Sequence, residues 1–195
     1  MEEIKKLFAA HRPAVDFVSL RYHREHDHQI SVRQNILEPL ATSFDEGVMV
    51  TVHHQGGTGY AATCDLSGAG IKAAFSEAQQ WAVRDSRITV TDFSKLEMPH
   101  PQGEFRSPVQ QSWDDVPLKD KLDFLQSVSK KLKNHESIVD WSADLWHSRS
   151  ERLYLTGDGG EVFQDFDRLV PMMRVQQIPF TIQLVLERSQ LVVVT

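Results

Sequence analysis

The chain has 195 residues, of which 41% are hydrophobic and 25% charged, and its formal net charge is −6. These proportions are typical of an ordinary folded protein with one large or two small domains, and the acidic balance argues against unaided DNA binding, because phosphates favour a concentrated basic surface. The sequence contains neither an uncharged apolar run long enough to span a bilayer nor a signal-peptide core, and its single cysteine, Cys64, excludes an internal disulfide. We therefore expect a cytoplasmic protein without direct contact to membrane or nucleic acid.

The N-terminal part of the sequence predicts one helix followed by strands. Residues 2–11 have the spacing of a short amphipathic helix that Pro13 ends. Strands are expected over 15–22, 29–35 and 36–44, and Pro39 indicates that the third is short or at a sheet edge.

Residues 45–87 carry the clearest pattern in the chain. Apolar and polar residues alternate over 48–53, as in a strand with unlike faces, and glycines at 56–59 supply the backbone freedom of a hairpin turn. In the returning strand, Cys64 is predicted to be a small core residue rather than a reactive thiol. Ser67 is placed to cap a helix over 68–85. The expected inward face of this helix is Ile71, Ala74, Phe75, Ala78 and Ala82.

The C-terminal part of the sequence predicts a second helix and further strands. A helix is expected over 118–133, with Leu118, Leu122, Leu125, Val128 and Leu132 facing inward. Strands are expected over 88–92, 138–147, 151–156, 161–167 and 169–175, with a glycine turn at 157–160.

The segregated order of helices and strands favours an α+β fold with antiparallel sheets, helices packed on one face and two subdomains. We predict a first α+β domain at 1–92. A linker with four prolines follows at 93–117, and 118–195 forms a second α+β subdomain with an atypical C-terminal tail.

Three small motifs connect this pattern with a known family. Glu46-Gly47-Val48 opens a strand, Gly59-Tyr60-Ala61 lies on its partner, and Asp65-Leu66-Ser67 precedes a helix. In this order the elements resemble the N-terminal domain of the TldD/PmbA family of zinc metalloproteases, which are also described as modulators of DNA gyrase. The resemblance is good over 14–92 and looser over 118–175, and none of the three motifs is catalytic in that family.

The catalytic motif of that family is absent from this sequence. Its members carry His-Glu-x-x-x-His on a helix of the C-terminal domain, where two histidines bind zinc and the glutamate activates water. Here the His135-Glu136 pair is followed by Val139 and Asp140, so no second histidine lies one turn on. The resemblance therefore implies a non-catalytic N-terminal portion with no catalytic, cofactor-binding or metal-binding residues, and zinc only in a further domain. The tail at 176–195 is interpreted either as one more strand or as an end created by truncation or frameshift.

Histidines are the other feature that suggests a binding site. On a strand, His26 and His28 would share one face, which makes them weak metal-ligand candidates together with the nearby His23. A solvated polar face is the favoured interpretation. His53 and His54 project to opposite faces and cannot form one shared site; we expect one to be half-buried and the other exposed.

Three hypotheses for the function follow from the sequence. The first is a substrate-side domain of a TldD/PmbA-type metalloprotease, inactive alone, that holds a peptide or protein substrate and forms a homo-oligomer or pairs with a family partner subunit. The second is a stand-alone protein-binding module of the gyrase-modulator type. The third is an unrelated α+β enzyme.

Overall fold

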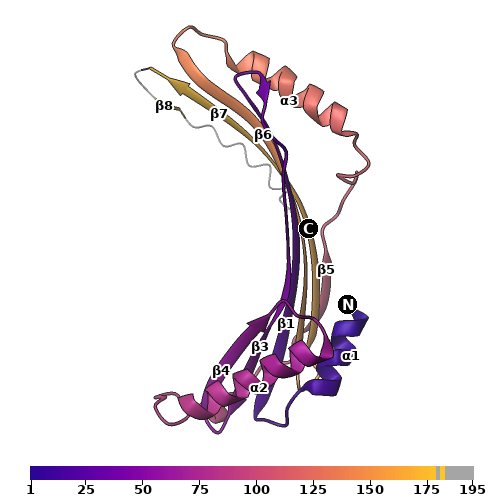
Figure 1. Ribbon diagram of the computed structural model, residues 1–195, viewed down its shortest axis with the longest axis vertical. Coiled ribbons are helices and arrows are strands. Elements are labelled where there is room, and N and C mark those ends of the chain that lie inside the picture. Colours follow the sequence, from indigo (N-terminus) through magenta and orange to yellow (C-terminus); the bar gives the residue numbers. More distant parts are fainter. Residues whose placement is uncertain (179–180, 183–195) are drawn as a thin grey trace, which may run out of the picture. The chain divides into compact units, whose positions relative to one another are not determined.

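The structure is a computed structural model that describes residues 1–178 and 181–182 (Figure 1). The chain forms two compact units, and each unit is assembled from separated segments. The first unit comprises Met1–Glu25, Asp45–Arg106 and Ser150–Asp165, and the second comprises His26–Phe44, Ser107–Arg149 and the chain from Phe166 onward. These units differ from the consecutive division into 1–92, 93–117 and 118–195, which stays a prediction for independently folding domains.

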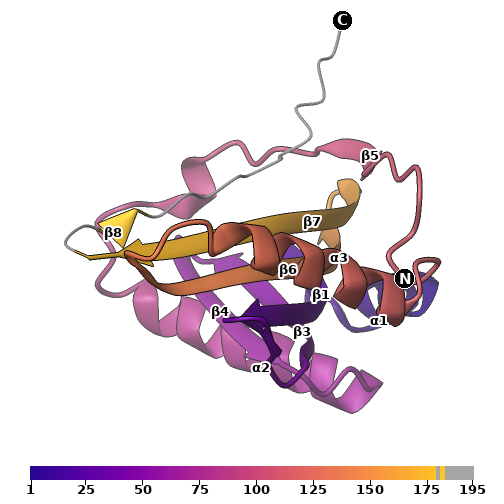
Figure 2. The same ribbon diagram turned by 90° about the horizontal axis from the view of Figure 1, so that it is seen from above.

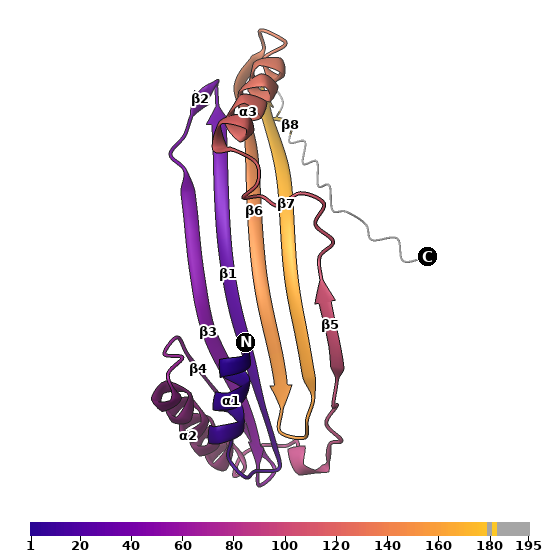
Figure 3. The same ribbon diagram turned by 90° about the vertical axis from the view of Figure 1, so that its right-hand side faces the viewer.

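The strands form one mixed sheet with the order β4-β3-β1-β6-β7-β5, while β2 pairs with β1 and β8 with β7 (Figure 3). Their bounds are β1 Phe17–Arg33, β2 Ile36–Leu37, β3 Ala41–His54, β4 Gly57–Thr63, β5 Gln102–Arg106, β6 Ile138–Thr156, β7 Glu161–Gln177 and β8 Thr181–Ile182. The β3–β4 pair is antiparallel, whereas β5 pairs with β7 in parallel. The α+β class is confirmed, but the expectation of purely antiparallel sheets is wrong at β5.

Several predicted strands are parts of longer ones. The strands expected at 15–22 and 29–35 are both in β1, those at 138–147 and 151–156 are both in β6, and those at 161–167 and 169–175 are both in β7. The polar residues between them do not end a strand, because they find partners on neighbouring strands, as Arg24 does with Glu151. The strand expected at 36–44 is instead interrupted around Pro39, between β2 and β3.

The first unit has its core between the sheet and two helices, α1 (Glu2–His11) and α2 (Gly68–Asp85). Figure 2 shows α2 lying along β3 and β4. The Phe8 ring from α1 packs against Phe75 from α2, with ring centroids 6.0 Å apart. The predicted inward face of α2 is confirmed, because all five of its residues are buried: Ile71, Ala74, Phe75, Ala78 and Ala82.

The start of α2 is also as predicted. The Ser67 hydroxyl accepts a hydrogen bond from the Gly70 amide at 3.1 Å and thereby satisfies one of the amides that have no partner within the helix. Asp65 supports the same turn, because one of its carboxylate oxygens accepts from the Ser67 amide at 3.0 Å. Hydrogen bonding with Ser67, through its side chain first and its amide second, lowers the pKa of the Asp65 carboxyl.

The hairpin between β3 and β4 turns earlier than expected. Gln55 and Gly56 form the turn and have positive φ angles of 55° and 82°, whereas the prediction placed the turn at 56–59. Gly57 and Gly59 lie within β4 and face α2. A Cβ atom at Gly59 would lie 2.2 Å from the carbonyl oxygen of Ala78. These two glycines therefore allow the helix to approach the strand closely.

Two other expectations in the first unit are corrected. Residues 88–92 form no strand, and the Ile88 and Val90 side chains there are 81% and 102% exposed. Cys64 is exposed rather than in the core, because β4 ends at Thr63 and the buried face of that strand belongs to Ala61. The stretch at 93–117, predicted as a linker, contains the short 3-10 helix η1 (Phe93–Lys95) and the edge strand β5.

The second unit has a smaller core beneath α3 (Leu118–Leu132). Leu125 is buried against strand residues, and Leu122, Val128 and Leu132 pack around it, as predicted. Leu118 departs from the predicted inner face, since it is 45% exposed. The strand residues of this core are Ile30, Val32, Ala143 and Leu145. Among the described helices, none has the length and apolarity needed to cross a membrane.

Candidate functional site

The candidate site is a cluster of rings in the second unit. His26 and His28 come from β1, and alternation along that strand places them on the face of Ile30 and Val32, which packs under α3. His147 comes from β6. The ring centroids of His26 and His28 are 4.3 Å apart, and those of His28 and His147 are 6.0 Å apart. We call His26, His28 and His147 the imidazole row.

An indole from the segment before α3 covers part of the imidazole row. We call residues 107–117 the strap. Within it, the Trp113 ring lies parallel to the His147 ring, at an interplanar angle of 2° and a centroid distance of 5.0 Å. Lys121 of α3 donates from its ammonium group to the Trp113 carbonyl oxygen at 2.7 Å, and the same ammonium lies 3.6 Å from the indole centroid. The indole is thus held between an ammonium and an imidazole.

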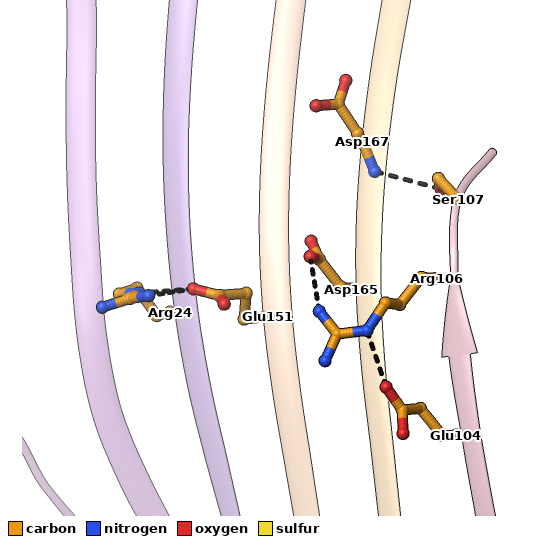
Figure 4. A network of polar contacts seen from close by, with 7 residues as sticks. All are labelled: Arg24, Glu104, Arg106, Ser107, Glu151, Asp165 and Asp167. Atoms are coloured by element: carbon orange, nitrogen blue, oxygen red, sulfur yellow. Dashed lines mark hydrogen bonds and ion pairs between the residues drawn. The ribbon is translucent and has the colours of Figure 1, made fainter. Parts of the chain in front are cut away.

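His147 is anchored on the sheet through one ring nitrogen. Its Nε2 lies 3.0 Å from an Asp167 carboxylate oxygen on β7, which orients the ring. Its Nδ1 is buried and has no hydrogen-bond partner in the part of the chain that the structure describes. The Asp167 amide donates to the Ser107 hydroxyl at 3.1 Å, which fixes the start of the strap to β7 (Figure 4).

The electrostatic environment disfavours charge on two groups of this cluster. Burial, followed by the nearby His26 and His147, lowers the pKa of His28, while Asp114 acts in the opposite direction. Burial also lowers the pKa of Lys121. Both effects follow from the cost of placing a charge in a poorly solvated environment.

No group of three or more metal-ligating side chains is placed to hold a metal ion within the residues that the structure describes. His26 and His28 form a contacting pair on one strand face, while His23 lies near Glu25 at 3.4 Å. The absence of catalytic and metal-binding residues stays a prediction. His135, of the His-Glu pair, instead contacts the Ser137 hydroxyl at 2.6 Å in the turn before β6.

Charged pairs in the first unit are a second polar feature. Arg24 donates from Nε to a Glu151 carboxylate oxygen at 2.8 Å, as Figure 4 shows. Arg106 donates to Glu104 at 2.6 Å and lies 3.6 Å from Asp165. Because each arginine already has a carboxylate partner, these residues connect strands and offer no unpaired charge to a ligand.

An open depression of about 510 Å³ lies on the first unit and includes Asp16, Gln55 and Asp92 in its lining. Its carboxylates are already engaged. Asp16 accepts from the Gln55 amide at 2.8 Å, and Asp92 accepts from the Ser94 amide at 3.1 Å. This depression therefore has the contacts of a loop junction rather than of a binding site.

His53, beside this loop region, is more buried than expected. The sequence predicted that one of His53 and His54 is half-buried and the other exposed. In the structure His53 is buried, with 7% of its surface exposed, and His54 is half-buried. The His53 ring stacks on Phe93 at a centroid distance of 4.7 Å and lies 5.2 Å from Phe17. Burial lowers the pKa of His53, with Asp16 acting in the opposite direction.

This burial predicts acid-sensitive stability in the first unit. In the unfolded chain His53 has the ordinary histidine pKa of 6.5, whereas in the folded chain its pKa is lower. The stability that depends on an uncharged His53 is therefore fully present above pH 6.5 and is lost as the pH falls below that value. Urea unfolding from pH 7.5 to pH 5 should show this loss, and His53→Phe, which keeps an aromatic ring at this position, should reduce it. An equal loss in the variant would contradict the assignment.

Comparisons with known proteins agree with this architecture. Residues 18–82 match the family model described as PmbA/TldA metallopeptidase domain 1. No curated protein matches the chain. Solved structures with the same fold include a proposed modulator of DNA gyrase from Bacteroides thetaiotaomicron, with a TM-score of 0.64 at 12% identity, covering 93% of this chain and 41% of that one.

Two further structures show the same likeness. A proposed modulator of a DNA gyrase from Thermotoga maritima has a TM-score of 0.63 at 15% identity, covering 91% of this chain and 44% of that one. TldE from Thermococcus kodakarensis has a TM-score of 0.60 at 17% identity, with coverages of 89% and 38%. The chain thus spans less than half the length of these three proteins.

The fold and the family match agree with the resemblance that the small motifs indicated. Residues 18–82 match the first domain of the PmbA/TldA metallopeptidases, and the chain has the same α+β fold as the three solved structures. The matched segment 18–82 lies inside the resemblance predicted for 14–92. It runs from β1 to α2 and belongs largely to the first unit, whereas the imidazole row and the strap lie in the second.

Proposed function

We propose that this chain is the non-catalytic, substrate-side part of a TldD/PmbA-type metalloprotease that acts in peptide maturation or proteolysis in the cytoplasm. One observation carries the proposal: residues 18–82 match the first domain of that family, while the 195 residues contain no His-Glu-x-x-x-His. In this account the chain holds a peptide or protein substrate, and the zinc ion and its glutamate belong to another domain or subunit.

The second unit offers a surface suited to this role. Phe44 is 62% exposed, its ring stands edge-on to His26 at 6.0 Å, and the imidazole row continues from it toward Trp113. Rings of this kind bind the apolar side chains and peptide groups of an extended chain, and their faces do not demand one particular sequence. Such a surface supports a role in holding substrates without supplying a nucleophile.

A second candidate function is a protein-binding module of the gyrase-modulator type. The descriptions of the Bacteroides and Thermotoga structures favour it. The net charge of −6 points to a protein partner rather than to DNA. Both candidates include association with a second copy or with a family partner subunit. Most of the tail at 176–195, namely 179–180 and 183–195, lies outside the described residues.

The proposal predicts that the purified chain is catalytically silent. After dialysis, metal analysis should find no stoichiometric zinc, and incubation with fluorogenic peptides should release no product, because the sequence lacks the two-histidine motif that holds zinc. The control is a His26→Ala, His28→Ala double variant, which removes the remaining candidate ligands. One zinc ion per chain that disappears in this variant would overturn the proposal, and so would chelator-sensitive cleavage.

A further inference from the structure

The strap is attached to the rest of the second unit by a hydrogen bond, by packing of Trp113 on the apolar core, and by contacts of its indole with an imidazole and an ammonium group. Its start is fixed by the hydrogen bond from the Asp167 amide to the Ser107 hydroxyl. Further along, the Trp113 indole stacks on His147, and the Lys121 ammonium lies against the indole ring. The indole therefore depends on a titratable imidazole for part of its contact with the sheet.

His28 is the imidazole whose charge the closed arrangement disfavours. Its ring centroid lies 6.3 Å from that of Trp113 and 6.0 Å from that of His147. The titratable and charged groups that face it are His26 on its own strand, His147 on β6, Asp114 in the strap and Lys121 on α3. Asp167 on β7 belongs to the same environment through His147. Burial opposes a proton on His28 most strongly, followed by the neighbouring His26 and His147, whereas Asp114 favours it.

Displacement of the indole would admit water to His28. A charged imidazole is then better solvated, so an open strap binds a proton at this ring more tightly than a closed one. By linkage, a fall in pH must favour the open state.

We propose that the Trp113 strap is a pH-sensitive latch, closed over the imidazole row at neutral pH and released when His28 takes up a proton in mildly acidic solution. Release would uncover the rings of His28 and His147. The latch depends only on contacts within the second unit and does not require the proposed role in proteolysis.

The test measures how accessible Trp113 is to acrylamide between pH 8 and pH 5. The fluorescence of Trp113 is obtained as the difference in fluorescence between the wild-type chain and Trp113→Phe. Far-UV circular dichroism confirms that both remain folded throughout. We expect the quenching constant of this component to rise below pH 6.5, with a shift of its emission to longer wavelength.

Two variants separate a latch from a general loss of structure. His28→Gln should abolish the rise, and Asp114→Asn should move its midpoint to higher pH, because the closed state then loses the carboxylate that favours a charged His28. His11→Gln, which changes a histidine of the first unit, should leave the midpoint unchanged. A quenching constant that stays flat in the wild type would overturn the proposal. The same pH response in His28→Gln or an unmoved midpoint in Asp114→Asn would do so too.

Discussion

Replacing Phe75 with alanine is expected to lower the free energy of unfolding of the first unit by about 3–5 kcal/mol, as deletion of a large buried aromatic ring does. The side chain is 2% exposed and packs between α2 and the sheet, with the Phe8 ring beside it. The loss combines the transfer of the ring to water with the cavity that remains. Denaturant unfolding followed by circular dichroism measures it.

Gln80→Ala is the matched control, because it lies on the exposed face of the same helix five residues on. Because alanine favours helix formation at least as well as glutamine, the denaturant midpoint should hardly change. If Phe75→Ala shifted the midpoint no more than Gln80→Ala does, α2 could not present its predicted face to the sheet.

Gly59→Ala is expected to destabilise the same unit by about 3 kcal/mol, a large effect for a single methyl group. An added Cβ would lie 2.2 Å from the Ala78 carbonyl oxygen and 2.5 Å from the Ala82 amide nitrogen. Both are backbone atoms of α2, so the whole helix must move away from β4 to admit it. The buried residues of the α2 face would then lose contact with the strands.

Gly103→Ala provides the comparison for this substitution. Gly103 lies in the edge strand β5, where an added Cβ meets nothing within 4 Å and the backbone conformation suits any residue. The denaturant midpoint of Gly103→Ala should stay near that of the wild type. A gain of a few tenths of a kcal/mol in the free energy of unfolding is consistent with the lower entropy of the unfolded chain. Equal effects of the two substitutions would show that Gly59 is not a contact point between helix and strand.

The helices could be predicted from the sequence because their determinants are local. Ser67 marks the start of α2, the inward face of α2 repeats at helical spacing, and Pro13 follows the end of α1. The glycines of the β3–β4 hairpin show the limit of such reasoning. Turn formation and close helix packing both call for glycine, and spacing alone does not distinguish the two uses at Gly56 and Gly59.

The lengths of the strands could not be predicted in the same way. Charged residues in the middle of β1 interrupt its apolar alternation, and only the partner on another strand explains why the strand continues through them. For Arg24 that partner is Glu151, which is 127 residues away in the sequence. The parallel pairing of β5 with β7 likewise depends on a neighbour that its own polar sequence does not indicate.

The candidate site was only partly visible in the sequence. His26 and His28 stand two residues apart and could be identified as a pair on one strand face. The contributions of Trp113 and His147 could not, because stacking between a loop residue and a distant strand has no local pattern. Asp167, which orients His147, is 20 residues from it on the next strand.

The central claim, that this chain holds peptides without cutting them, is tested most directly by the binding of a fluorescently labelled unfolded peptide, such as a fragment of casein. Fluorescence anisotropy should rise to saturation with increasing chain concentration, the rise should be the same with and without a metal chelator, and mass spectrometry should recover the peptide intact. An anisotropy that never saturates would contradict the account, as would shorter fragments that disappear when the chelator is added.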